Sequence, residues 1–173
     1  MEIKIQTRFT IATEDGVRIV KTLSARLAIE KFSTLMDATT LASYIDNNYS
    51  DKQLIKDMNA LGNQWLVVYR NGDPAGYCRI TDRGIKPASL TGKRAGRIAD
   101  FGILKEFQEE ELRKSLLDKC LTVCSNLDAI WVREYAGNPF LSFFESNQFV
   151  KEQEADPKFE LPLPSVQLIK MNL

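Results

Sequence analysis

Residues 97–135 read RIADFGILKEFQEEELRKSLLDKCLTVCSNLDAIWVREY, and this stretch decides the fold. Residues 97–104 and 129–135 are apolar runs of strand length, and each predicts a buried strand. Residues 108–126 between them carry apolar side chains at helical spacing. That stripe consists of Leu112, Leu116, Cys120 and Cys124, and it continues to Leu127 directly after this range. A strand, a helix and a second strand in this order predict a crossover connection between two neighbouring strands in the middle of a sheet.

The remaining sequence adds strands and helices on both sides of this crossover. Helical spacing predicts further helices over residues 15–32, 40–47, 51–61 and 139–147. Alternating or apolar runs predict further strands over residues 2–13, 64–70, 76–80, 149–154 and 166–172, with a polar, basic loop over 81–96. We therefore predict an α/β (α+β) protein, in which a mixed central sheet of about six to seven strands is flanked by helices. We expect residues 1–173 to form a single domain.

Three local signals predict where elements begin and end. Ser50 followed by Gln53 fits a capping box, in which each side chain bonds the other residue's backbone N–H. Gly62 suits a left-handed cap at the end of the helix over residues 51–61. Asn71-Gly72 predicts a tight hairpin turn.

Charge and composition exclude several classes of function. The chain has 173 residues, with 23 Lys and Arg against 23 Asp and Glu, so its formal net charge is zero. A neutral chain offers no global electrostatic basis for binding nucleic acid or an anionic membrane. No apolar run reaches the roughly 20 residues of a membrane span, and the first residues do not resemble a signal peptide. The three cysteines, an odd number, favour free thiols in a reducing cytoplasm.

The sequence contains no histidine. This excludes a histidine-based triad, a histidine–metal cluster and a histidine general base. Cys120 and Cys124 stand four residues apart and could share a helix face, but two thiols alone do not make a zinc site. We expect two small buried apolar residues there and predict no metal site.

Three stretches of the chain carry a family resemblance. Residues 103–108 read ILKEFQ, residues 138–149 read NPFLSFFESNQF, and residues 65–80 contain a Gly76-Tyr77 step. In this order they resemble the strand end before the crossover helix, the Asn-Pro-x-Leu-x-Phe-Tyr-x-x-x-Gly-Phe segment and the hairpin of the GNAT superfamily of acetyl-CoA-dependent N-acetyltransferases. Residues 41–61 resemble the two-helix arm of its polyamine-acetyltransferase branch. The resemblance covers essentially the whole chain and implies the GNAT fold.

The resemblance also implies how a donor binds. The family holds acetyl-CoA between two splayed central strands, here residues 97–104 and 129–135, and the pantetheine amides pair with the first of them. The pyrophosphate lies on backbone amides where the crossover helix begins, because free N–H groups and the helix dipole attract an anion. The cofactor-binding candidates that follow from the resemblance are Phe101, Ile103, Leu104, Gln108, Glu109, Glu111, Arg113, Lys114, Asn138 and Phe144.

The turn before the crossover helix departs from the family pattern. Gln108 is retained, but Glu111 and Arg113 occupy the two positions where the family has small residues. Their side chains can block the close approach of phosphates. A carboxylate about 5 Å from a phosphate charge repels it by roughly 3 kcal/mol at an effective dielectric near 20. The alternative is that Glu109, Glu110 and Glu111 are an ordinary acidic helix start.

The catalytic candidates lie on the two central strands. The resemblance places the family's tyrosine acid at Phe144, which has no hydroxyl, and packing is the alternative role of this ring. Tyr135 is the candidate replacement acid. Asp100 and Glu134 are candidate bases for the proton of an amine, and ordinary solvated carboxylates are the alternative.

Basic side chains gather in and beside the loop at residues 81–96. They are Arg79, Arg83, Lys86, Lys93, Arg94 and Arg97. A solvated loop explains them, and a surface for an acidic partner or a displaced phosphate is the alternative.

The resemblance implies acetyl transfer from acetyl-CoA to the primary amine of a small, polyamine-like molecule, with activity weakened or lost through the substitutions. A non-catalytic GNAT-fold module for binding or dimerisation, with a second copy of the chain as partner, is the alternative. A third is an acyltransferase that uses another donor. We predict neither a nucleic-acid nor a membrane partner. Acceptor specificity is expected in residues 37–61 and 81–96.

Overall fold

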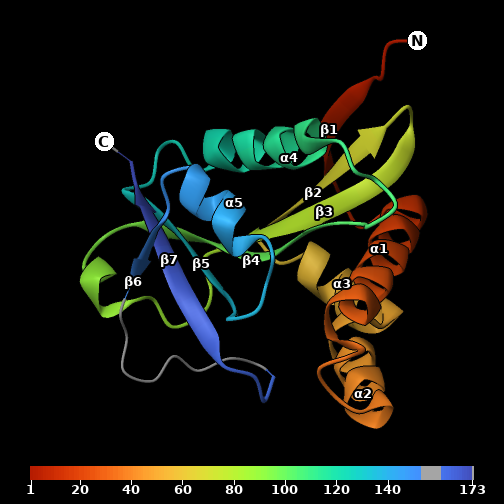
Figure 1. The fold of residues 1–173 in the computed structure, drawn as a ribbon, viewed down its shortest axis with the longest axis horizontal. Helices are drawn as coiled ribbons and strands as arrows, with labels where there is room; N and C mark the ends of the chain where they lie inside the picture. The colour runs from red at the N-terminus through yellow and green to blue at the C-terminus, as the bar shows by residue number, and fades with distance from the viewer. Residues whose placement is uncertain (153–160, 173) are drawn as a thin grey trace. The chain divides into compact units, whose positions relative to one another are not determined.

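A computed structural model describes residues 1–152 and 161–172, and Figure 1 shows their course. The chain begins with β1 (Ile5–Thr10), α1 (Glu14–Phe32), α2 (Ala38–Tyr49) and α3 (Asp51–Met58). The hairpin of β2 (Asn63–Arg70) and β3 (Asp73–Thr81) is followed by a short 3₁₀ helix (Ala88–Leu90), β4 (Ala95–Ile103) and α4 (Glu110–Val123). The last elements are β5 (Ala129–Tyr135), α5 (Leu141–Ser146), β6 (Val150–Glu152) and β7 (Ser165–Met171).

Seven strands in the described part of the chain form one mixed sheet in the order β1-β2-β3-β4-β5-β7-β6. β4 and β5 run parallel, and their ladder extends from the Ala95–Ala129 pair to the Ile98–Val132 pair. The helix between them in the sequence is α4, so the predicted crossover is confirmed. β1 pairs antiparallel with β2, and β7 pairs antiparallel with both β5 and β6. The predicted class, a mixed sheet of six to seven strands flanked by helices, is confirmed.

Several predicted boundaries were wrong by a few residues. The crossover helix is shorter at both ends than residues 108–126. α5 begins at Leu141 rather than 139, because the residues before it form a turn in which the Leu141 N–H donates to the Asn138 carbonyl at 3.1 Å. β6 covers Val150–Glu152, and residues 153–154 of the strand predicted there lie outside the described residues.

Gly62 does not cap α3, contrary to the prediction. The helix ends at Met58 with Asn59 as its C-cap, at a φ of −89°. The Asn63 side-chain amide donates to the Asp57 carbonyl at 2.9 Å. A terminal carbonyl of α3 is thereby satisfied, and no left-handed glycine is required.

The other two local signals correspond to real contacts. The Ser50 side chain accepts a hydrogen bond from the Gln53 N–H at 3.3 Å, which is one half of a capping box. The other half is absent, because the Gln53 side chain donates to Asp57 at 3.0 Å instead. The hairpin turn has positive φ at both Asn71 (51°) and Gly72 (91°), the backbone of the predicted tight turn.

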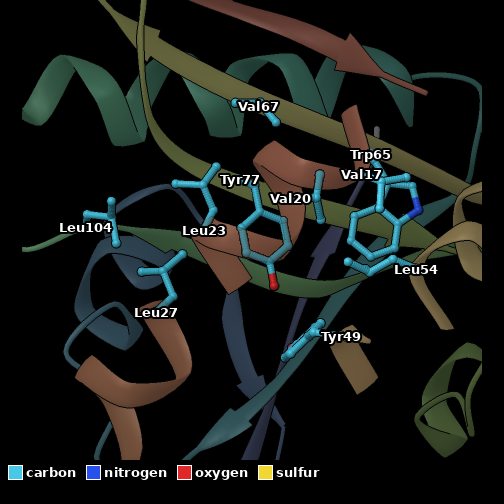
Figure 2. Close-up of a cluster of buried hydrophobic side chains, with 10 residues drawn as sticks. All are labelled: Val17, Val20, Leu23, Leu27, Tyr49, Leu54, Trp65, Val67, Tyr77 and Leu104. Atoms are coloured by element: carbon cyan, nitrogen blue, oxygen red, sulfur yellow. The ribbon is translucent and has the colours of Figure 1, made fainter. Parts of the chain in front are cut away.

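The chain divides into two compact units, Met1–Ile80 with Asp100–Cys120 and Thr81–Ala99 with Leu121–Leu173. That both belong to one domain stays a prediction. The core of the first unit, drawn in Figure 2, consists of Val17, Val20, Leu23, Leu27, Tyr49, Leu54, Trp65, Val67, Tyr77 and Leu104. One cluster of buried residues in the second unit consists of Leu90, Ala129, Trp131 and Ile169.

β3 is covered on both faces within the first unit. Tyr77 belongs to the core formed with α1, α2 and α3. Its neighbour Cys78 lies 3.0 Å from Cys120 of α4, measured between the two sulfur atoms. Successive side chains of a strand point to opposite faces, so α4 covers the face opposite to α1 (Figure 1).

Leu54 anchors α3 in this core, since its side chain is fully buried while that of the next residue, Ile55, is 47% exposed. We expect Leu54→Ala to lower the free energy of unfolding by about 2–5 kcal/mol, because truncation leaves a cavity. Ile55→Ala is the matched control and should cost less than about 1 kcal/mol. Urea denaturation measures both, and equal losses would contradict this docking of α3.

Candidate functional site

Polar side chains surround Asp100 of β4 in the first unit. Tyr49, the last residue of α2, donates its hydroxyl proton to Asp100 Oδ1 at 3.3 Å. Tyr44 Oη lies 3.3 Å from Tyr49 Oη, within hydrogen-bonding distance. On β3, Arg79 Nε lies 3.7 Å from Asp100 Oδ2, and the Tyr77 hydroxyl points toward Tyr49 (Figure 2). We name these five residues the Asp100 cluster.

The Asp100 cluster has a buried floor and a solvent-exposed side. Tyr49 and Tyr77 are 7% and 3% exposed, whereas the side chains of Asp100 and Arg79 are 18% and 24% exposed. Trp65 supports the arginine, with the guanidinium carbon 5.6 Å from a ring centroid. Trp65 also stacks on Tyr77 at 6.1 Å, with the ring planes 13° apart. Solvent therefore reaches part of the Asp100 and Arg79 side chains, whereas the Tyr49 and Tyr77 side chains are almost fully shielded from it.

The environment fixes the protonation of the phenols. Burial, and then the negative charge of Asp100, raise the pKa of Tyr49 and of Tyr77 well above the ordinary value. Burial by itself lowers the pKa of Arg79, but the charge of Asp100 and its other neighbours outweigh burial and raise it. At neutral pH the phenols are therefore protonated and can donate hydrogen bonds, and Arg79 is a cation.

A second charged group lies where α4 begins. Glu109 immediately precedes the helix, and its Oε1 accepts a hydrogen bond from Arg70 Nε of β2. Its Oε2 is buried and has no hydrogen-bond partner among the described residues. Backbone N–H groups at this helix start, and then Arg70, lower the pKa of Glu109. The N-terminus of α4 thus already has a carboxylate beside it, at the place where the resemblance implies a pyrophosphate.

The other residues predicted at this turn are turned to solvent or to neighbours on the chain. Gln108 Nε2 donates to the Lys105 carbonyl. Glu111 is exposed. Lys114 Nζ lies 3.1 Å from Asp118 one helical turn further on. The structure does not gather these side chains into a cage for an anion, and what α4 offers is its backbone.

Backbone groups in β4 and directly after it already have hydrogen-bond partners. The Phe101 carbonyl accepts a hydrogen bond from Lys31 Nζ of α1 at 2.9 Å. The Leu104 N–H donates to the Ala75 carbonyl at 2.9 Å. Ile103, between them, is 9% exposed. A pantetheine along β4 would use backbone groups other than the Leu104 N–H, because that group has its partner within the first unit.

The candidates of the second unit are buried. Glu134 is 5% exposed, so the expectation of a merely solvated carboxylate was wrong for this residue. Tyr135 is 6% exposed, and burial, followed by the charge of Glu134, raises its pKa. This phenol stays protonated at neutral pH. Asn138 Oδ1 accepts the Phe140 N–H at 2.8 Å, while Asn138 Nδ2 is buried with no partner in the described part of the chain.

The aromatic residues of α5 pack together, as the alternative reading of Phe144 predicts. Phe144 is fully buried, with its ring 5.3 Å from that of Phe149 and 5.9 Å from that of Phe143. Gln148, where the family has glycine, has a φ of 70°. That left-handed backbone explains why glycine suits this position and shows that glutamine is tolerated at a cost in strain.

Three of the basic residues predicted in or beside residues 81–96 have partners within the second unit. Arg97 is 9% exposed and lies over Trp131, with its guanidinium carbon 5.2 Å from the ring centroid. Arg94 pairs with Asp128 at 3.2 Å. Lys86 Nζ donates to the Lys93 carbonyl at 2.8 Å. Within the described residues, no helix is long and apolar enough to cross a membrane, and no group of three metal-binding side chains occurs.

The sequence analysis did not identify four residues of these sites, namely Tyr44, Tyr49, Tyr77 and Arg70. Tyr49 stands in a polar stretch, residues 46–51, and no motif marks it as a site residue. Tyr77 was noted only in the Gly76-Tyr77 step of the family resemblance, which gives it no role in a site. Arg70 ends a strand 39 residues before its partner Glu109. Asp100 was identified, but its partner Tyr49 stands 51 residues away.

The fold is that of the GNAT superfamily, which the sequence resemblance implied. No family model matches the sequence. The PaiA N-acetyltransferase of Thermoplasma acidophilum, solved in complex with coenzyme A, superposes with a TM-score of 0.75 at 12% identity over 99% of both chains. A GNAT-family acetyltransferase of Staphylococcus aureus gives 0.66 at 15% identity, covering 99% of this chain and 100% of that one. A GNAT-family acetyltransferase of Streptococcus pneumoniae gives 0.64 at 16%, covering 97% and 99%.

We expect Glu109→Gln to lower the melting temperature at neutral pH and to lose this effect in acid. The pKa of Glu109 is lower in the folded chain than the ordinary 4.5, so its stabilisation is present above about pH 4.5 and is lost as the pH falls through the folded value. Melting curves of both proteins from neutral to acidic pH measure the difference. The effect should shrink in an Arg70→Gln background, and a difference that grew in acid would contradict this role.

Proposed function

We propose that the chain is an acetyl-CoA-dependent N-acetyltransferase that modifies the primary amine of a small molecule, with Asp100 accepting the proton of the amine. The observation that carries the proposal is the Asp100 cluster, in which a carboxylate of β4 is held by Tyr49 and Arg79 and is still reached by solvent. The GNAT fold supports the reaction class, and a complex of the PaiA protein with coenzyme A supports the choice of donor.

The residues of the Asp100 cluster have different roles in deprotonating the acceptor amine. A primary amine is protonated at neutral pH and has to lose a proton before it can act as a nucleophile. Asp100 takes that proton, directly or through a water molecule. Tyr49 and Arg79 hold the carboxylate in one orientation, which is the positioning that a general base needs. Acetyl-CoA, when bound, supplies the acetyl thioester that the amine attacks.

Tyr135 is the residue of this chain that suits protonation of the leaving thiolate. Phe144, at the position of the family's tyrosine acid, is fully buried among other rings and has no proton to give. The hydroxyl of Tyr135 is protonated at neutral pH, because burial and Glu134 raise its pKa. A group that has to give a proton is useful only if it still carries one at the working pH.

The phosphates of acetyl-CoA are expected to bind weakly at the start of α4. The first-turn N–H groups of α4 suit a pyrophosphate, and Gln108 and Lys114 lie on either side of them in the sequence. Glu109 opposes a phosphate there, because its carboxylate lies beside the same helix terminus and has a lowered pKa. We therefore expect acetyl-CoA to bind with a dissociation constant well above the micromolar range.

Asp100→Asn tests the base. We expect the rate of acetyl transfer to fall by about 100- to 10,000-fold, the usual contribution of a general base, with little change in acetyl-CoA affinity. Asp46→Asn, an exposed carboxylate on α2, is the matched control and should keep the wild-type rate. Thiol release from acetyl-CoA with a panel of primary amines measures the rate, and calorimetry measures the affinity. An unchanged rate in Asp100→Asn would remove this residue from the mechanism.

Glu109→Gln tests the donor site. Removing one negative charge beside the phosphates should lower the dissociation constant of acetyl-CoA by about tenfold at low salt, since salt screens part of the repulsion. Asp118→Asn changes the same charge further along α4, where Asp118 pairs with Lys114, and should have little effect. Titration calorimetry compares the two variants. Equal changes in both would show that Glu109 does not face the phosphates.

The Arg70–Glu109 pair favours a second candidate, a GNAT-fold binding module without catalysis. A carboxylate held beside the helix terminus occupies the environment of the donor's phosphates. A binding module differs from a weakened enzyme in that acetyl-CoA binding and acetyl transfer are lost completely. Neither the wild-type chain nor Glu109→Gln would then bind acetyl-CoA or release thiol with any amine.

A further inference from the structure

Two thiols of the first unit lie in direct contact. Cys78 of β3 and Cys120 of α4 stand 42 residues apart in the sequence, and their sulfur atoms are 3.0 Å apart. Both side chains are fully buried. A disulfide bond is about 2.05 Å long, so closing the pair requires the sulfurs to approach by roughly 1 Å.

We propose that Cys78 and Cys120 are a redox modification site, which a peroxide converts into a disulfide that ties α4 to β3. The proposal is independent of the proposed acetyl transfer, because neither thiol belongs to the Asp100 cluster or to the start of α4. It rests on the contact between the two sulfurs and on the way α4 is held against the strands.

Other contacts hold α4 in register with the sheet. Thr7 Oγ1 of β1 lies 2.8 Å from Ser115 Oγ, five residues before Cys120. Lys119 Nζ lies 5.1 Å from the centroid of the Phe9 ring. These two contacts join α4 to β1, and the contact between the thiols joins it to β3. The helix is thus held against two strands of the sheet while the two sulfurs are in contact.

The third cysteine is an internal comparison. Cys124 is as buried as the pair, with 1% exposure, but it lies beyond the end of α4 at Val123. Burial alone therefore does not single out Cys78 and Cys120. What distinguishes them is the sulfur–sulfur contact between a strand and the helix packed on it.

The chemistry balances with hydrogen peroxide as the oxidant. One thiolate attacks a peroxide oxygen, the O–O bond breaks, and a sulfenic acid and hydroxide form. The second thiol attacks the sulfenic sulfur, the S–S bond forms, and the S–O bond breaks as hydroxide leaves. In total the two thiols lose two electrons and two protons, and one peroxide becomes two waters. A dithiol reductant reverses the modification.

Burial sets the rate of this reaction. A fully buried thiol meets peroxide only when α4 opens locally from the sheet, so oxidation is slow and follows the frequency of that opening. Once closed, the disulfide constrains the unfolded chain over a loop of 42 residues. We expect the oxidised protein to melt roughly 5–15 °C higher than the reduced one.

Mass spectrometry of the full-length chain tests the site. The native protein is treated with hydrogen peroxide, quenched with catalase, denatured, and alkylated with N-ethylmaleimide. The alkylated thiols should fall from three to one, and peptide mapping should find Cys78 linked to Cys120. Dithiothreitol should restore all three. Three alkylated thiols after prolonged oxidation, or a link that includes Cys124, would overturn the proposal.

Alanine variants control for the identity of the pair. Cys78→Ala and Cys120→Ala should each abolish the linked product and the rise in melting temperature, whereas Cys124→Ala should keep both. Circular dichroism first shows that each variant is folded. If one member of the pair does not tolerate alanine, the other variant decides, together with the mapped link in the wild-type chain. A rise in melting temperature that persisted in Cys78→Ala would also contradict the proposal.

Discussion

The burial of β3 on both faces is the constraint on which the sites of the first unit depend. Tyr77 packs into the core beneath α1, and the next residue, Cys78, contacts Cys120 of α4. Because side chains alternate along a strand, the two faces receive different chemistry. On one face of β3, the phenols and Arg79 lie around Asp100. On the other face, Cys78 contacts Cys120. A shift of β3 by one residue would exchange these faces and dissolve both groups at once.

Two carboxylates of the first unit show how environment assigns different roles to the same group. Asp100 is approached by the Tyr49 hydroxyl and by Arg79 and is open to solvent on one side, which suits proton transfer. Glu109 lies at the start of α4 and is paired with Arg70, which suits stabilisation of a helix. In the proposed function, the second arrangement opposes a phosphate at the same helix terminus, so stability at α4 and affinity for the donor compete at this turn.

The substitutions in the family segment over residues 138–149 have separate physical consequences. Phe144 lacks the hydroxyl of the family's tyrosine, and its ring is fully buried against Phe149 and Phe143. Gln148 keeps the left-handed backbone that glycine adopts without strain, so the turn before β6 is retained although its usual residue is not. The fold therefore accommodates both residues, and Phe144 has no hydroxyl with which to perform the role that the resemblance attaches to its position.

The sequence by itself determined the elements and their order, and the tertiary structure decided the sites. The helical stripe over residues 108–126, the Asn71-Gly72 turn and the Ser50 cap act over a few residues, so they can be identified from local pattern. The sequence also identified Asp100 as a candidate base. Its partner Tyr49 is 51 residues away, Arg70 is 39 residues from Glu109, and Cys78 is 42 residues from Cys120. Such pairs depend on strand order and register, which local patterns leave open because many pairings bury the same apolar residues equally well.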